Sequence, residues 1–129
     1  MSIAHITFAT PDVAAAAEFY SQTLGWQIVH HALNIECPAA WLQIGVDQQL
    51  HLLQIPEFRP SEFEGEFGRH LAVIVPLADF AGLQNRLRAH DAEIISPQRT
   101  TPFQRFFFRS PDGYIIEVVE KEGHVDESA

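Results

Sequence analysis

The sequence is poor in cysteine and lysine, and both shortages restrict its chemistry. Cys37 is the single cysteine among the 129 residues, so the chain cannot form an internal disulfide. Lys121 is the single lysine, and it lies in the polar C-terminal stretch. Schiff-base catalysis and lysine-anchored phosphate loops are therefore not expected.

Positive charge and long apolar runs are also scarce. Eight Lys+Arg residues stand against 17 Asp+Glu residues, which gives a formal net charge of −9. Because a nucleic-acid binder needs a basic face to neutralise phosphates, we expect no nucleic-acid partner. No apolar stretch approaches the roughly 20 residues that cross a bilayer, and the N-terminus lacks the basic and apolar segments of a secretory signal. We therefore expect a cytoplasmic protein without a membrane partner.

The sequence contains an α+β pattern that occurs twice. The first copy predicts a strand over residues 3–9, a helix over 11–24, and strands over 26–32, 40–44 and 50–55. The second copy predicts a strand over 69–75, a helix over 79–90, and strands over 93–96, 103–109 and 114–120. We expect a single domain over 1–120, with modules at about 1–55 and 68–120, an acidic linker over 56–67 and a polar tail over 121–129.

The spacing of equivalent residues indicates that the second pattern duplicates the first. His5 and His70 are 65 residues apart, and His51 and Glu117 are 66 apart. A proline follows each first-strand histidine by six residues. One module cannot cover its own sheet, so we predict that two modules pair around a cavity, within one chain or between the chains of a homodimer.

Four side chains that can bind a metal recur at equivalent places in these modules. His5 and His70 lie in the first strand of each module, and His51 and Glu117 lie in the last. Each interrupts an apolar strand, and a carboxylate such as Glu117 is costly to bury unless a cation compensates it. Three imidazoles and one carboxylate suit a divalent ion, namely Zn, Ni, Co, Mn or Fe(II).

Other interpretations of these residues remain open. A single strand histidine is commonly half-buried and hydrogen-bonded, and Glu117 can instead pair with Arg105 or Arg109. Arg105 is also a candidate for binding a substrate carboxylate, against the alternative of a salt bridge to a surface glutamate. The remaining histidines are interpreted as surface residues: His30, His31, His90 and His124.

Four stretches carry a resemblance to a known family. They are Ala4-His5-Ile6-Thr7-Phe8, Glu18-Phe19-Tyr20 through Leu24-Gly25-Trp26, Gly68-Arg69-His70-Leu71-Ala72, and Phe107 through Ser110-Pro111-Asp112-Gly113 to Glu117. They resemble the vicinal oxygen chelate superfamily, which includes glyoxalase I, methylmalonyl-CoA epimerase, fosfomycin-resistance thiol transferases, extradiol dioxygenases and bleomycin-binding proteins. The resemblance implies two βαβββ modules that form an open mixed-sheet barrel, with the metal at His5, His51, His70 and Glu117.

The resemblance also implies metal-assisted chemistry on a small molecule that chelates through two adjacent oxygens. Four protein ligands leave two positions on an octahedral ion, which suits an isomerase or lyase that stabilises an enolate. An Fe(II) extradiol dioxygenase, which needs three open positions, and a drug-binding protein without catalysis remain alternatives. A fosfomycin thiol transferase would lack a cationic phosphonate pocket. Enzymes resembling glyoxalase I typically carry glutamate at the position of His51, so Glu117 is the expected catalytic base.

Overall fold

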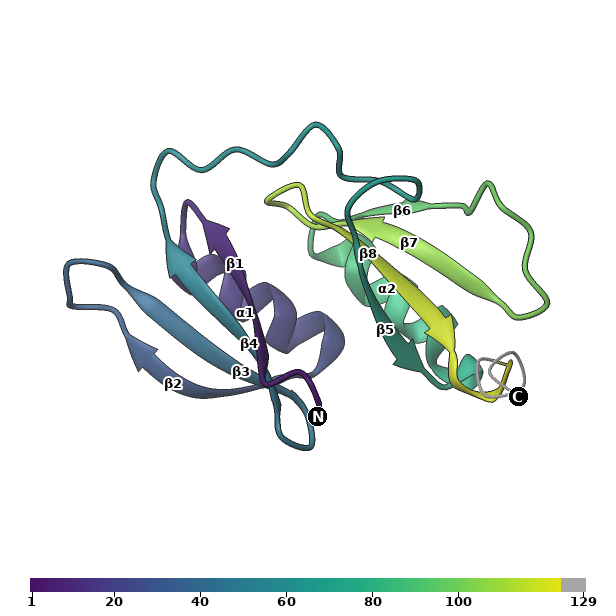
Figure 1. Cartoon of the computed structure of the whole chain (residues 1–129), viewed down its shortest axis with the longest axis horizontal. Helices are drawn as coiled ribbons and strands as arrows, with labels where there is room; N and C mark the ends of the chain where they lie inside the picture. The colour runs from purple at the N-terminus through teal and green to yellow at the C-terminus, as the bar shows by residue number, and fades with distance from the viewer. Residues whose placement is uncertain (124–129) are drawn as a thin grey trace. The chain divides into compact units, whose positions relative to one another are not determined.

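The computed structural model describes residues 1–123, and the chain divides into two compact units. The first unit is Met1–Arg59, and the second begins at Pro60. Each unit contains a four-stranded mixed sheet with an α-helix packed on it, as Figure 1 shows. The predicted α+β architecture of two βαβββ modules is confirmed. His124 and most of the predicted tail lie outside the described residues.

The first unit follows the predicted order of elements. Its bounds are β1 (His5–Thr10), α1 (Val13–Leu24), β2 (Gln27–Ala32), β3 (Ala39–Gly45) and β4 (Gln48–Gln54). The strands lie in the order β1-β4-β3-β2, with β1 parallel to β4 and the other neighbours antiparallel. The parallel pair arises because the chain passes along α1 and the β2–β3 hairpin before it returns beside β1.

Helix α1 begins and ends where its local sequence predicts. The side chain of Asp12 accepts a hydrogen bond from the backbone N–H of Ala15 at 3.1 Å, which caps the first turn. Gly25 follows the last residue with a φ of 74°, a left-handed conformation that glycine adopts without a steric penalty.

The second unit repeats this topology. Its bounds are β5 (Leu71–Val75), the 3₁₀ turn η1 (Leu77–Asp79), α2 (Phe80–Ala89), β6 (Glu93–Ile95), β7 (Arg105–Arg109) and β8 (Ile115–Glu120). The strand order is β5-β8-β7-β6, again with one parallel pair, β5 with β8. Strand β5 starts two residues later than predicted, because Arg69 belongs to the preceding loop and bridges to Glu64.

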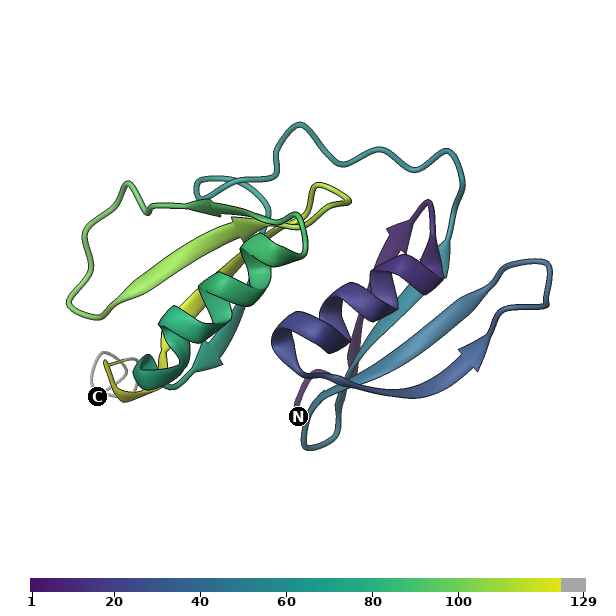
Figure 2. The ribbon, with the colours of Figure 1, turned by 180° about the vertical axis from the view of Figure 1, so that it is seen from behind.

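Each helix covers one face of its own sheet, as Figure 2 shows, and we call the opposite side the helix-free face. One strand phase is buried against the helix in each sheet, and in β7 and β8 the opposite phase is buried as well. In the first unit the helix-facing residues are Phe8, Leu42, Leu50 and Leu52, and in the second Phe106, Phe108, Ile116 and Val118. The predicted metal ligands alternate along the chain with these helix-facing residues, so their side chains lie on the helix-free faces.

The sheet registers make the two units equivalent at the level of single residues. His5 lies two positions before the residue that pairs with His51 across β1 and β4. His70 lies two positions before the residue that pairs with Glu117 across β5 and β8. The same diagonal relation therefore joins the two members of each pair. The closure of the units into a barrel stays a prediction.

Part of the segment predicted as a linker packs onto the second unit. The side chain of Glu64 is only 2% exposed, and its carboxylate accepts hydrogen bonds from the backbone N–H of Ile115 at 2.8 Å and from Arg69 at 2.7 Å. Two acidic residues of this segment, Glu64 and Glu66, therefore have structural partners, whereas Glu57 and Glu62 are exposed. Among the described residues, no helix is long and apolar enough to span a membrane.

Candidate metal centre

The second unit brings two predicted ligands, His70 and Glu117, into direct contact. The imidazole Nε2 of His70 lies 3.1 Å from Oε1 of Glu117, and its Nδ1 lies 3.1 Å from the carbonyl oxygen of Gly65. Both partners are hydrogen-bond acceptors, whereas a neutral imidazole carries only one N–H. With Nδ1–H donating to the carbonyl, a proton or a metal ion must lie between Nε2 and the carboxylate.

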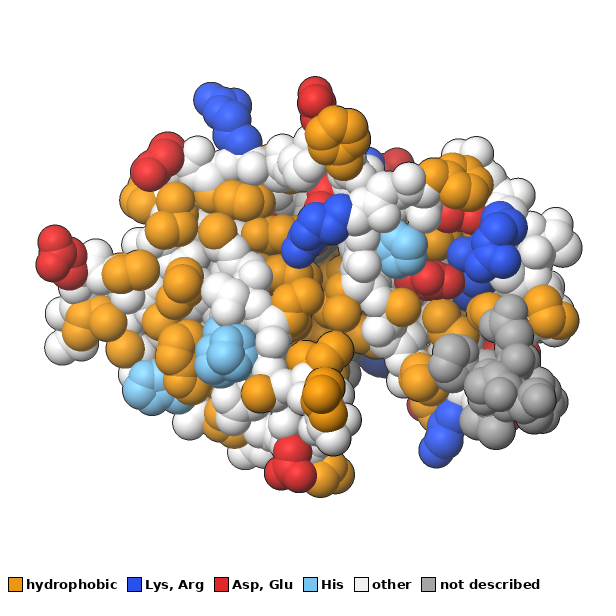
Figure 3. Space-filling model, viewed as in Figure 1, with side chains coloured by type: hydrophobic (Ala, Val, Ile, Leu, Met, Phe, Trp, Pro, Cys, Tyr) orange, Lys and Arg blue, Asp and Glu red, His pale blue; other side chains and the backbone are white. Residues whose placement is uncertain are grey.

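This geometry fits a divalent metal. Two ligands at about 2.0–2.2 Å from one ion and about 90° apart are separated by about 3 Å, close to the observed Nε2–Oε1 distance of 3.1 Å. A metal-binding histidine typically donates its other N–H to a carbonyl or carboxylate, as His70 does to Gly65. Figure 3 shows a histidine side chain beside acidic and basic side chains on one face of the molecule.

Arg105 holds the other oxygen of Glu117. Its Nη1 donates to Oε2 of Glu117 at 3.1 Å, and its Nη2 donates to Oε2 of Glu66 at 2.9 Å and to the carbonyl of Arg99 at 2.6 Å. The side chains of Arg105, Glu66 and Glu117 are 3%, 9% and 10% exposed. One guanidinium thus faces two carboxylates, and the buried cluster retains a negative charge that favours a cation at Oε1.

The pairing of Arg105 with Glu117, one of the interpretations that the sequence left open, is therefore present. The guanidinium also lies 5.3 Å from the centre of the Phe107 ring, a cation–π contact. A substrate carboxylate at Arg105 would compete with these partners, so the substrate-binding role of this residue stays a prediction.

Glu66 is a member of this cluster that the sequence did not single out. Its two oxygens accept the backbone N–H groups of Gln98 at 2.7 Å and Arg99 at 2.9 Å, in addition to Arg105. Burial alone would raise the pKa of Glu66, but these three donors together hold it below its ordinary value. In the sequence, Glu66 is one of several acidic residues in a segment without periodicity, so no pattern distinguishes it from its neighbours.

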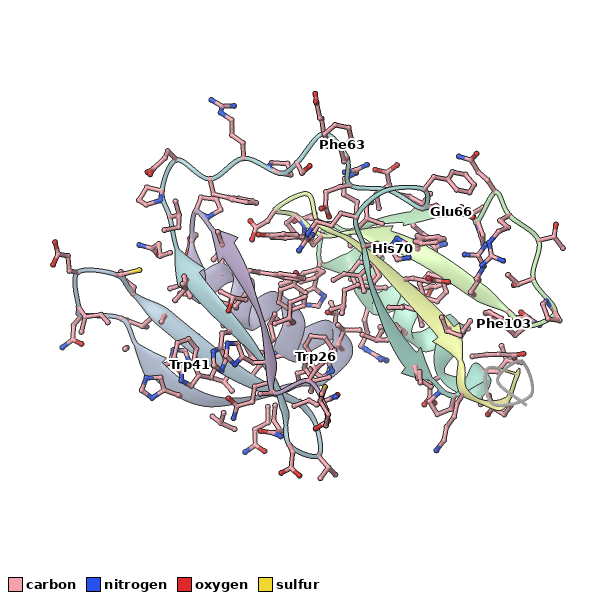
Figure 4. The ribbon with its side chains drawn as sticks, in the orientation of Figure 1. Trp26, Trp41, Phe63, Glu66, His70 and Phe103 are labelled. Atoms are coloured by element: carbon pink, nitrogen blue, oxygen red, sulfur yellow. The ribbon has the colours of Figure 1, made fainter. Side chains whose placement is uncertain are left out.

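The first unit places His5 and His51 in a stack of aromatic rings. Their ring centres are 3.9 Å apart with an interplanar angle of 13°, and the Trp41 ring lies 3.9 Å from the other face of His51 at 20°. His30 continues the row, 5.4 Å from Trp41. Each strand of the sheet contributes one ring to the helix-free face, and Figure 4 labels Trp41 there. The exposed position of His30 agrees with the prediction of a surface residue.

A chain of side-chain amides sets the proton position on His51. Gln43 donates its amide N–H to the carbonyl of Gly45, which can only accept, and this fixes the orientation of the Gln43 amide. Gln49 then donates to Oε1 of Gln43 at 3.3 Å and presents its own Oε1 to Nε2 of His51 at 2.9 Å. His51 therefore carries its proton on Nε2, and its lone pair for a metal is on Nδ1. Burial and the neighbouring His5 lower the pKa of His51, which favours the neutral ring.

The four predicted ligands are thus present as two pairs, one in each unit. Within residues 1–123, no three His, Cys, Asp or Glu side chains converge on one point. Each pair lies on the helix-free face, and the donor set of three imidazoles and one carboxylate suits a divalent ion. The turn around Gly113, whose φ is 98°, connects β7 to β8.

Comparison with protein families identifies the class of protein that this fold defines. Residues 2–118 match the model of the Glyoxalase/Bleomycin resistance protein/Dioxygenase superfamily. The chain belongs to this superfamily, and the resemblance seen in the sequence is confirmed. No curated protein sequence matches the chain.

Several solved structures share the fold over nearly the whole chain. A glyoxalase family protein from Enterococcus faecalis is 27% identical with a TM-score of 0.69, over 92% of this chain and 97% of its own. The fosfomycin resistance protein FosX from Listeria monocytogenes, complexed with Mn(II) and 1S,2S-dihydroxypropylphosphonic acid, is 13% identical with a TM-score of 0.76, over 99% and 98%. TnmS3, an antibiotic binding protein from Streptomyces sp. CB03234, is 20% identical with a TM-score of 0.69, over 93% and 95%.

Proposed function

We propose that the protein is a divalent-metal-dependent enzyme that acts as an isomerase or lyase on a small molecule with two adjacent oxygens. Its ligands are His5, His51, His70 and Glu117. The observation that carries the proposal is the contact of Nε2 of His70 with Oε1 of Glu117 at 3.1 Å, beside the contact of Nδ1 with the carbonyl oxygen of Gly65. Such a contact is favourable only with a cation or a proton between the two atoms.

The FosX complex from Listeria monocytogenes supports this proposal, because it has the same fold. It contains Mn(II) together with a compound that carries hydroxyl groups on adjacent carbons. A chelating substrate of that kind suits an ion with two positions left by four protein ligands. The equivalence of the two half-sites in sequence and register also supports a common role for both pairs.

Glu117 is the residue proposed to move a proton. Its Oε2 is bonded to Arg105, which would anchor the carboxylate while Oε1 accepts a proton from the substrate. A bound divalent ion supplies Lewis-acid stabilisation of negative charge on a substrate oxygen. His51 is poorly suited as the base, since Nε2 already carries a proton bonded to Gln49 and Nδ1 is the proposed ligand atom.

Metal content tests the proposal directly. Protein stripped with chelator and reloaded with Mn(II) or Zn(II) should retain about one equivalent per chain, and His70→Ala should retain much less because the His70–Glu117 pair is lost. His31→Ala is the matched control, since His31 is exposed and lies outside both pairs. Equal metal content in all three proteins, or none in the wild type, would contradict a metal enzyme.

An extradiol dioxygenase differs from an isomerase or lyase because it needs a redox-active metal. Protein loaded with Zn(II) or Ni(II) should catalyse an isomerase or lyase reaction but cannot activate oxygen. Oxygen consumption with catechols that depends on Fe(II) would replace the isomerase or lyase assignment with the dioxygenase one.

A second candidate function is small-molecule binding without catalysis, and the ring stack of the first unit favours it. Trp41 and His51 are only partly buried, so a flat aromatic ligand can approach their edges. The antibiotic-binding neighbour TnmS3 has the same fold. Quenching of Trp41 fluorescence by aromatic ligands in metal-free protein would support binding, and quenching that requires the metal would support the enzyme.

A further inference from the structure

Glu66 connects two loops of the second unit to the metal-ligand pair. It lies in the loop before β5, and its carboxylate binds two consecutive N–H groups, those of Gln98 and Arg99, in the loop before β7. Its Oε2 also accepts from Nη2 of Arg105, while Nη1 of the same guanidinium donates to Glu117. Figure 4 shows Glu66 and His70 in the same part of this unit.

The charge on this cluster depends on Glu66. With Glu66 ionised, one guanidinium is shared between two carboxylates, so the charge of Glu117 is only partly neutralised. Without that negative charge, Arg105 would neutralise Glu117 alone and weaken its attraction for a cation. The carbonyl oxygen of Arg99 also accepts from Nη2 of Arg105, and the backbone N–H of Arg99 donates to Glu66. Loss of the Glu66 carboxylate would therefore also loosen the loop that presents this carbonyl.

We propose that Glu66 is a positioning residue that fixes Arg105 on Oε2 of Glu117 and so leaves Oε1, on the His70 side, negative for the metal. This inference rests on the proposed function, because it assigns Glu66 a part in metal binding. Outer partners that orient metal ligands commonly affect the metal affinity by 10- to 100-fold.

A substitution to glutamine tests this role, because both oxygens of Glu66 accept hydrogen bonds. In Glu66→Gln the amide nitrogen faces an N–H donor whichever way the amide is turned, so at least one bond is lost together with the charge. Glu64→Gln is the matched control from the same loop. Its amide oxygen still accepts from Ile115, and only the bond to the partly exposed Arg69 is lost.

The experiment measures the dissociation constant of Mn(II) for the wild type and the two variants by titration calorimetry. Thermal unfolding without metal establishes that each variant is folded. We expect the constant to rise about tenfold or more in Glu66→Gln and to change less than twofold in Glu64→Gln. Equal changes in both variants, or no change in either, would overturn the role of Glu66.

Two further measurements keep the outcome interpretable. Hydrogen exchange should show the amides of Gln98 and Arg99 protected in the wild type and at least one of them exchanging faster in Glu66→Gln, which tests the geometry without metal. If Glu66→Gln does not fold, Arg105→Lys replaces it, since a single ammonium cannot bridge both carboxylates as the guanidinium does, and we again expect a tenfold loss. A wild type that binds no Mn(II) overturns the proposed function itself, whereas tight binding unaffected by either variant overturns only the inference.

Discussion

Replacement of Arg105 by methionine should destabilise the metal-free protein and make it depend on metal. The side chain is 3% exposed and pairs with Glu117, which is 10% exposed. Methionine retains much of the apolar stem but leaves the carboxylate of Glu117 buried without its guanidinium. Breaking a buried ion pair by removing one partner costs about 3–5 kcal/mol, so we expect a loss of this size in the free energy of unfolding.

A divalent ion should restore part of this loss, because it supplies the missing positive charge at the same carboxylate. At about 100 times its dissociation constant, a ligand specific for the folded state stabilises it by about 2.7 kcal/mol. Urea unfolding of wild type and Arg105→Met, each with chelator and with saturating Zn(II), measures both effects. A loss below about 0.5 kcal/mol in the metal-free variant would refute the view that the guanidinium compensates a buried carboxylate.

Three further predictions concern single residues. Alanine at Gly68 would bring its Cβ against the carbonyl oxygen of Phe63, so urea unfolding should show a loss of about 1–3 kcal/mol, and an unchanged midpoint would contradict this loop geometry. Because burial and His5 lower the pKa of His51, the unfolded state takes up a proton at a higher pH than the folded state. The free energy of unfolding should therefore fall as the pH drops below 6.5, and His51→Asn should reduce this fall. Parallel pH dependences of the wild type and the variant would refute this prediction. Trp41→Leu removes the ring on His51 and should cost about 1 kcal/mol in the same assay, whereas no change would deny the stack a stabilising role.

The fold could be predicted from the sequence because its signals are local and occur twice. The alternation of apolar residues predicted the strands, and Gly25 marked the end of the first helix. The positions of His5 and His51 were predicted to be equivalent to those of His70 and Glu117, and the strand registers have this equivalence. Strand starts were less well predicted, since the residues before β5 and β7 belong to loops that are hydrogen-bonded to distant segments of the chain.

The partners of the ligands could not be predicted, because they come from distant segments without a pattern. Glu66 reaches Arg105 across 39 positions, and the acidic segment around it is typical of a solvated connection. The amide chain from Gln43 to His51 depends on the hairpin between β3 and β4, which only the folded register defines. These contacts decide which ring nitrogen or carboxylate oxygen is free, and composition carries no information about them.

The central claim is most directly tested by a crystal structure of zinc-loaded protein with anomalous scattering measured at the zinc edge. The account predicts an anomalous peak about 2.0–2.2 Å from both Nε2 of His70 and Oε1 of Glu117, with Arg105 still bonded to Oε2. A zinc-loaded protein in which the peak lies away from these two atoms, with a hydrogen bond alone joining them, would contradict it.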